Sequence, residues 1–114
     1  MELARTRAAA LLGGDSTEVI FTSGGSESNN QALIGTALAN KDRGRHLIST
    51  TIEHPAILNP PHWLEGQGLT VTYLGVDGTG RVDPQTVRRA ITDETILISI
   101  MHANNEVGTI QPIA

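Results

Sequence analysis

The first segment of the sequence suited to chemistry is a run of small polar residues, Ser23-Gly24-Gly25-Ser26, directly after an apolar stretch. Glycines let backbone N–H groups approach a ligand closely, and the N-terminus of a following helix offers unpaired N–H groups and a positive dipole end to a phosphate. The segment has neither the lysine and spacing of a Walker loop nor the G-x-G-x-x-G pattern of a dinucleotide site. It therefore predicts either a phosphate cradle or an ordinary capped turn between a strand and a helix.

A histidine follows the next apolar stretch, in the segment Glu53-His54-Pro55. An imidazole at such a place can stack on an aromatic ligand or move a proton near neutral pH. The alternative is a partly exposed loop histidine beside a proline that starts a helix. The four histidines of the chain show no metal-ligand spacing such as H-E-x-x-H, so the sequence predicts no metal site.

Paired asparagines, Asn104 and Asn105, follow the final apolar stretch. Their amide groups both donate and accept hydrogen bonds and so suit a polar ligand, while Gly108 permits a tight backbone path beside them. Asparagine and glycine are also common in turns, which leaves a purely structural role open.

Strands and helices alternate along the sequence in an order that would bring these three segments together. Short β-branched or apolar runs predict strands over residues 19–22, 46–51, 69–76 and 95–101. Helical spacing and capping residues predict helices over residues 2–12, 26–38 and 57–66, and a fourth helix that starts at Pro84. Such alternation predicts an α/β class with three layers, α/β/α, a mainly parallel sheet and right-handed crossovers. Ligands of such sheets bind beyond the carboxyl ends of the strands, where all three segments fall.

Local signals set the expected ends of these helices. Gly13 suits the left-handed residue that closes the first helix, and Ser26 suits the N-cap of the second. Pro60 and Pro61 are tolerated only near a first turn, so the third helix is expected to start late or to kink. Asp83 suits the N-cap of the fourth helix.

Length and composition exclude several classes of protein. The 114 residues fit one domain, and a net charge of -4 with scattered Lys and Arg leaves no basic footprint for nucleic acid. No apolar run is long enough to span a membrane and no export signal is present, so the expected location is the cytoplasm. The chain has no cysteine, which excludes a disulfide scaffold, a thiolate metal site and a thiol nucleophile within it.

Four stretches of the sequence carry a resemblance to a known family: "VIFTSGGSESNN", "HLISTTIEHPAIL", "LTVTYLGVDGTGRVD" and "TILISIMHANNEVGTIQPIA". On these stretches, which extend over essentially the whole chain, it resembles the cysteine desulfurases of the NifS and IscS type. These enzymes belong to the class V aminotransferase branch of the fold-type I pyridoxal phosphate enzymes. The motifs T-x-E-H and M-H-x-N-N-E-V-G look more like this group than like the selenocysteine lyases or other class V aminotransferases.

The resemblance implies pyridoxal phosphate as the cofactor and L-cysteine as the substrate, with L-alanine released and the sulfur left as a persulfide on an enzyme cysteine. It also implies a homodimer or higher oligomer, sulfur-acceptor scaffold proteins as partners, and a role in iron–sulfur cluster biogenesis. By the same resemblance, Gly25 and Ser26 hold the cofactor phosphate, with Ser26 standing where threonine is common. His54 stacks on the pyridine ring and helps to transfer protons, and Asn105 lies near the phenolic oxygen of that ring and the substrate. The other matching motif positions are expected to act as supports: Glu27, Ser28, Glu53, His102, Asn104 and Glu106.

Parts that the family reaction needs are absent from this sequence. The only lysine, Lys41, lacks the family's Schiff-base context, no aspartate stands in a D-x-x-Q pattern, and there is no cysteine to carry a persulfide. Residues 1–114 are therefore expected to be part of the large cofactor-binding domain, truncated before the Schiff-base lysine, and to be inactive alone. One alternative is a non-catalytic remnant that binds phosphate or self-associates, and another is a different class V aminotransferase-like enzyme. An open sheet edge at residues 19–22 or 96–101 would favour self-association.

Overall fold

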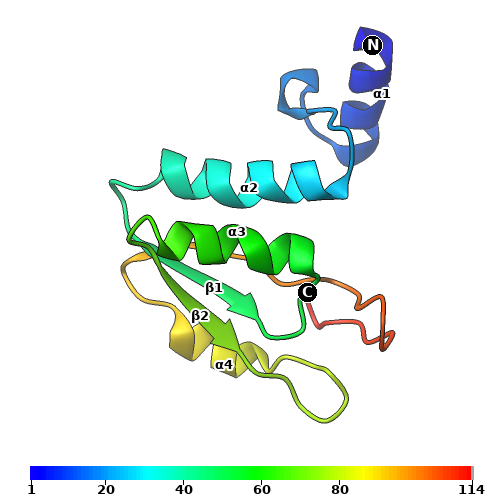
Figure 1. Ribbon diagram of the computed structural model, residues 1–114. Coiled ribbons are helices and arrows are strands. Elements are labelled where there is room, and N and C mark those ends of the chain that lie inside the picture. The colour runs from blue at the N-terminus through cyan, green and yellow to red at the C-terminus, as the bar shows by residue number, and fades with distance from the viewer. Residues whose placement is uncertain (114) are drawn as a thin grey trace.

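A parallel three-stranded sheet forms the centre of the computed structural model, which describes residues 1–113 (Figure 1). The strands are β1 (His46–Thr50), β2 (Thr70–Leu74) and β3 (Thr95–Ile98). The order across the sheet is β2-β1-β3, and β1 pairs in parallel with both neighbours. The last three of the four predicted strands are therefore confirmed, each somewhat shorter than expected.

Helices cover both faces of this sheet. Their bounds are α1 (Glu2–Leu12), the short 3-10 helix η1 (Ser16–Glu18), α2 (Gly25–Ala39), α3 (Pro55–Glu65) and α4 (Pro84–Ala90). α2 and α3 pack side by side on one face, and α4 lies on the other, while α1 and η1 stand apart from the sheet (Figure 1). The sheet and its two helical layers confirm the predicted α/β/α fold.

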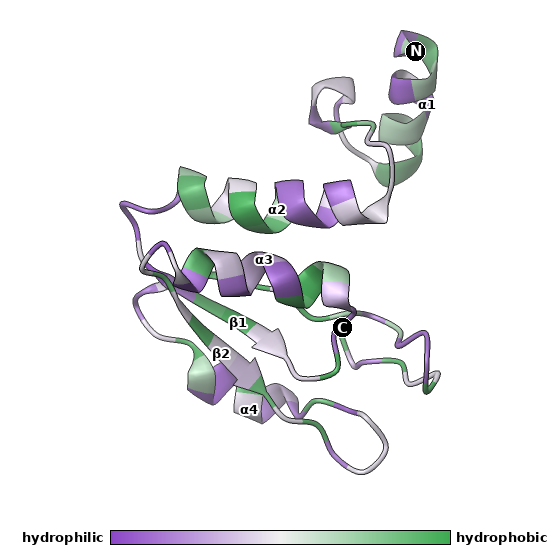
Figure 2. Cartoon of the chain, viewed as in Figure 1, coloured by the Kyte–Doolittle hydropathy of each residue, from purple (hydrophilic) through white to green (hydrophobic). Residues whose placement is uncertain are grey.

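Two apolar clusters on opposite faces of β1 hold the layers together. Successive residues of a strand point to opposite faces of the sheet. Leu47 packs with Ala37 of α2 and Leu64 of α3, whereas Ile48 lies in a second cluster against which Val87 of α4 packs. All five residues of β1 are buried, the pattern of a strand covered on both faces. Figure 2 shows apolar residues along β1 and at the covering helices.

A buried histidine joins the three strands at the edge of the sheet where β1 begins. The Nδ1 and Nε2 atoms of His46 each lie 2.8 Å from a threonine hydroxyl, that of Thr95 on β3 and that of Thr72 on β2. The residue is only 7% exposed, and both ring nitrogens have protein hydrogen-bond partners in place of water. His46 thus links the central strand to both of its neighbours.

Two predicted helix ends are confirmed. Gly13 closes α1 in the left-handed conformation with φ 72, which glycine adopts without steric strain. Asp83 caps α4, because its side chain accepts the backbone N–H of Gln85 at 2.9 Å, and Pro84 occupies the first helical position.

The start of α2 differs from the prediction that Ser26 is its N-cap. The helix begins one residue earlier, and its N-cap is Gly24, which makes no side-chain capping bond. The Glu27 carboxylate reaches back to the backbone N–H of Ser23 at 2.7 Å and to the Ser23 hydroxyl at 2.6 Å. This bond holds the residue that precedes the N-cap, and Ser26 is the second residue of the helix instead of its N-cap.

The start of α3 also differs from the prediction, because the helix begins at Pro55 and runs unbroken through Pro60 and Pro61 (Figure 1). The two prolines lack the N–H groups of two intrahelical hydrogen bonds. Both rings are buried, and Leu64 on the same helix joins the core beneath it. Tertiary packing of this helix therefore outweighs the local preference for a late start or a kink.

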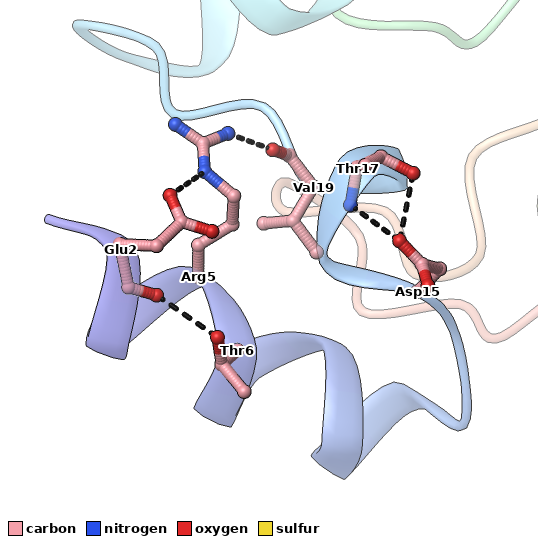
Figure 3. A network of polar contacts seen from close by, with 6 residues as sticks. All are labelled: Glu2, Arg5, Thr6, Asp15, Thr17 and Val19. Atoms are coloured by element: carbon pink, nitrogen blue, oxygen red, sulfur yellow. Dashed lines mark hydrogen bonds and ion pairs between the residues drawn. The ribbon is translucent and has the colours of Figure 1, made fainter.

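The predicted strand over residues 19–22 is wrong. Val19 has extended backbone, but no β-pairing involves this segment within residues 1–113, and Phe21 is 48% exposed. The segment instead contacts α1, as the Arg5 guanidinium, which pairs with Glu2 at 3.4 Å, donates to the Val19 carbonyl (Figure 3). The same guanidinium lies 5.5 Å from the centre of the Phe21 ring. A strand needs a neighbour for its N–H and C=O groups, and the part of the sheet formed here offers none to this segment.

The C-terminal end of α1 exposes apolar side chains. Leu11 and Leu12 are 87% and 78% exposed, at the end of a helix that does not touch the sheet (Figure 2).

Within residues 1–113, no helix has the length and apolar character needed to cross a membrane.

Candidate functional site

The carboxyl ends of the strands and the N-termini of α2 and α3 lie at the same edge of the sheet (Figure 1). A cavity of about 430 Å³ opens there between the loop after β1, the turn after β2 and the segment after β3. It is lined by residues 51–54, 78–80 and 104–107 and by Thr109. His54 and Asn105 both line this cavity, so the structure brings two of the four predicted site residues together.

His54 is fixed at this cavity by a hydrogen bond to the helix that follows it. Its Nδ1 accepts the backbone N–H of Ala56 at 3.1 Å, which makes His54 the N-cap of α3. A ring nitrogen that accepts a hydrogen bond carries no proton, so the neutral imidazole is the Nε2–H tautomer. His54 therefore keeps Nε2–H as the donor for a ligand, and a second proton on Nδ1 would break the cap.

The two adjacent asparagines, Asn104 and Asn105, have different roles at the cavity. Asn104 is 9% exposed, its Oδ1 accepts the N–H groups of Glu106 and Val107 at 2.8 and 2.9 Å, and its Nδ2 donates to the Ile52 carbonyl at 3.0 Å. Asn105 is exposed and lines the cavity. Asn104 therefore builds the turn, and the amide of Asn105 remains available for a ligand.

A third wall of the cavity was missed by the sequence reasoning, and it is formed by Gly78, Thr79 and Gly80. Gly80 has φ 80, and a Cβ at this position would lie 3.2 Å from Oγ1 of Thr109. The Thr109 hydroxyl donates to the Thr79 carbonyl, so glycine permits the two loops to meet this closely. The available signal was the position of this turn, which also follows a strand at its carboxyl end.

Gly25 and Ser26 lie outside this cavity, at the N-terminal end of α2 (Figure 1). The backbone N–H of Ser28 bonds the Gly24 carbonyl at 3.1 Å, so the N–H groups before it are left without intrahelical acceptors. A Cβ added to Gly25 would meet no atom of residues 1–113 within 4 Å, so the space beside the backbone is open. These donors and this open space fit a phosphate group.

A carboxylate in the same first turn opposes an anion. The pKa of Glu27 lies below the ordinary value of 4.5 because the Ser23 hydroxyl, and then the Ser23 backbone N–H, donate to its carboxylate. Glu27 is therefore ionised near neutral pH. Its negative charge makes the start of α2 a weaker anion site than the helix dipole alone would provide.

Comparison with known proteins places this chain and its fold among enzymes of one family. The aminotransferase class-V family matches residues 1–114. The cysteine desulfurase IscS of Methanosarcina thermophila is 58% identical over 113 residues, which cover 99% of this chain and 28% of that protein. The crystal structure of DndA from Streptomyces lividans has a TM-score of 0.91 at 43% identity, covering 99% of this chain and 32% of that chain. A structure of SspA in complex with cysteine has a TM-score of 0.88 at 45% identity, covering 98% and 32%.

The fold and the edge site define a three-layer α/β protein of the kind that binds ligands beyond the carboxyl ends of its strands. The chain belongs to the class V aminotransferase family. It spans 28% of the length of its Methanosarcina thermophila relative, so it holds only a part of the enzymes it matches.

Proposed function

We propose that this chain is part of the large domain of a cysteine desulfurase and forms one wall of its pyridoxal phosphate site. The observation that carries the proposal is the meeting of His54 and Asn105 in one cavity beyond the carboxyl ends of the strands. The similarity to the cysteine desulfurase IscS of Methanosarcina thermophila and to SspA in complex with cysteine supports the choice of L-cysteine as substrate.

In this proposal the residues of the chain bind and orient the cofactor. The N–H groups of Gly25 and Ser26 and the Ser26 hydroxyl hold its phosphate. The His54 imidazole would pack on its ring with Nε2–H as a hydrogen-bond donor, and it would help to transfer protons when Nδ1 releases the Ala56 N–H. The Asn105 amide would donate to the phenolic oxygen. When bound, pyridoxal phosphate supplies an electron sink for the bond changes at the substrate.

The complete reaction would convert L-cysteine into L-alanine and leave the sulfur as a persulfide for scaffold proteins of iron–sulfur cluster biogenesis. This chain has no cysteine to carry that sulfur. Its only lysine, Lys41, is exposed and follows the end of α2 that lies away from the start of α3 (Figure 1). We therefore propose that the chain alone does not turn over L-cysteine, which alanine formation above the rate of the cofactor without protein would contradict.

Binding of the cofactor by the chain alone is expected to be weak. A helix N-terminus contributes about 0.3 to 1 kcal/mol to an anion at an exposed site, whereas micromolar binding requires about 8 kcal/mol. The Glu27 carboxylate in the first turn of α2 lowers the helix contribution further. A dissociation constant in the millimolar range is therefore expected.

Titration followed by NMR tests the site. Inorganic phosphate and pyridoxal phosphate should both shift the backbone amide signals of Gly25 and Ser26, and the signals of His54 and Asn105 should respond only to the ligand that carries a ring. Pyridoxine phosphate, which has no aldehyde, controls for covalent reaction with Lys41.

A matched pair of variants separates the phosphate site from general effects on α2. Ser26→Ala should weaken the response of the α2 amide signals to inorganic phosphate and to pyridoxal phosphate. Ser28→Ala should not, because the Ser28 hydroxyl is already engaged with that of Thr22 at 2.6 Å. The proposal fails if neither ligand moves the Gly25 and Ser26 signals at millimolar concentration.

A further inference from the structure

Glu53, the residue before His54, is a carboxylate that is only 6% exposed. Its Oε1 accepts the hydroxyl of Thr50 and the backbone N–H of Met101, both at 2.8 Å. Thr50 is the last residue of β1, and Met101 belongs to the segment that follows β3. A single carboxylate oxygen therefore joins the carboxyl ends of two neighbouring strands.

The burial of this carboxylate is not compensated by charge. Removal of a carboxylate from water is costly unless a cation or a full set of hydrogen bonds replaces the water. Within residues 1–113 the ion pairs do not include Glu53, and its Oε2 is buried without a hydrogen-bond partner. An apolar side chain of similar size would satisfy the needs of packing alone at lower cost, so the position of Glu53 indicates a role in the geometry of the site.

A second tie runs between the same two loops. The Nδ2 of Asn104 donates to the carbonyl of Ile52 at 3.0 Å. Glu53 directly precedes His54, and Asn104 directly precedes Asn105. In each loop a buried residue that makes the tie is therefore followed by an exposed residue that lines the cavity.

We propose that Glu53 is a positioning residue, which fixes His54 and Asn105 relative to each other across the cavity. It acts through Oε1, whose bond to the Met101 N–H holds the segment that carries Asn105 against the loop that carries His54. The bond to the Thr50 hydroxyl stays within the first loop and does not connect it to the segment that carries Asn105. Only the ligand-binding test of this inference rests on the proposed function.

Three variants separate positioning from general stability. Glu53→Gln keeps a carbonyl oxygen that can accept both hydrogen bonds, whereas Glu53→Leu removes them with little change in size. Thr50→Val removes one donor to the same oxygen but leaves the tie to Met101, so it is the matched control. The readouts are the ¹⁵N signals of the His54 ring and of the Asn105 side-chain amide, together with the midpoint of urea unfolding.

In Glu53→Leu the His54 and Asn105 signals should shift or double while the methyl signals of Leu47 in the core stay in place. Glu53→Gln and Thr50→Val should keep the His54 and Asn105 signals. Pyridoxal phosphate should bind about tenfold more weakly to Glu53→Leu and within about twofold of normal to Glu53→Gln, the scale expected for the loss of one hydrogen bond.

Unchanged His54 and Asn105 signals in Glu53→Leu would overturn the inference, as would an equal disturbance in Thr50→Val. If Glu53→Leu does not fold, Glu53→Asp decides, because its shorter side chain cannot keep the bond to the Met101 N–H. Disturbed His54 and Asn105 signals in Glu53→Asp, with retained signals in Glu53→Gln, support positioning, and undisturbed signals in Glu53→Asp refute it. If Glu53→Leu disturbs these signals but pyridoxal phosphate does not bind even the unmodified chain, the proposed function fails and the positioning role of Glu53 stands.

Discussion

Replacement of His54 by alanine should destabilise the protein because it removes the N-cap of α3. The Nδ1 of His54 accepts the Ala56 N–H at 3.1 Å, a normal length for such a bond, at an exposed position. Loss of a side-chain N-cap costs about 0.5 to 2 kcal/mol, typically about 1. With a urea m-value of about 1–3 kcal/mol/M, the midpoint of unfolding should fall by about 0.3 to 1 M.

His54→Asn is the companion variant, because asparagine is a strong N-cap but has no imidazole. It should recover most of the lost midpoint while it still abolishes the response of Asn105 to pyridoxal phosphate. Unfolding can be followed by circular dichroism and by the fluorescence of Trp63, which lies on α3.

His62→Ala serves as a control on the same helix. The His62 ring lies 3.1 Å from the Glu65 carboxylate and 3.5 Å from the Tyr73 hydroxyl, with 5.7 Å between the centres of the His62 and Tyr73 rings, and the side chain is 64% exposed. It should change the midpoint less than His54→Ala does. If His54→Ala leaves the midpoint unchanged, or if His54→Asn is no more stable than His54→Ala, the capping role and the tautomer derived from it are refuted.

Three further predictions concern the core, a turn and the sheet edge. Leu47→Ala should lower the free energy of unfolding, measured by urea denaturation, by about 2 to 5 kcal/mol. Leu11→Ala, at an 87% exposed position, should change the free energy of unfolding by less than about 0.5 kcal/mol. The pKa of Asp77 lies below its ordinary 3.8 because the Thr79 hydroxyl and then backbone N–H groups donate to it. Because the pKa of Asp77 is lower in the folded chain than in the unfolded chain, its carboxylate stabilises the folded turn above pH 3.8. This stabilisation is lost as the pH falls through the pKa of Asp77 in the folded chain. The protection of the Thr79 amide, measured as the ratio of the intrinsic exchange rate of an unfolded chain to the observed rate at the same pH, should therefore fall on acidification in the unmodified chain, and Asp77→Asn should abolish this fall. Ile98 is 41% exposed on β3, which is an edge strand of the sheet, so the chain should self-associate through this edge. Ile98→Lys should shift the chain toward the monomer in sedimentation. An unmodified chain that sediments as a monomer at high concentration would contradict association through this edge.

The elements that could be predicted from the sequence are those whose signals are local or whose burial is complete. β1 places an apolar residue on each face, Leu47 on one and Ile48 on the other, because helices cover both faces, and this local signal is visible without knowledge of its neighbours. The end of α1 at Gly13 and the start of α4 after Asp83 depend on residues within one turn. The positions of His54 after β1 and Asn105 after β3 follow from the same alternation, since parallel strands present their carboxyl ends at one edge of the sheet.

The failures have a different physical origin. Residues 19–22 carry the same β-branched and aromatic signal as a true strand, but pairing is decided by a partner far away in the sequence. The cap by His54 could not be predicted while α3 was expected to begin after Pro55, because capping depends on the first helical residue. The wall at Gly80 depends on its contact with Thr109, which no local pattern of the turn reveals.

The central place of β1 in the sheet has a consequence for the order in which the chain folds. The ring of His46 on β1 contacts Thr72 on β2, which is 26 residues away in the sequence, and Thr95 on β3, which is 49 residues away. Closing a loop of twice the length costs about 0.6 kcal/mol more in entropy, so β2 should pair with β1 before β3 does. The ties from Met101 to Glu53 and from Asn104 to Ile52 span 48 and 52 residues, so they form only once β3 has docked. The cavity is therefore among the last parts of the protein to assemble, and a folding intermediate that already pairs β1 with β2 would still be unable to bind a ligand there.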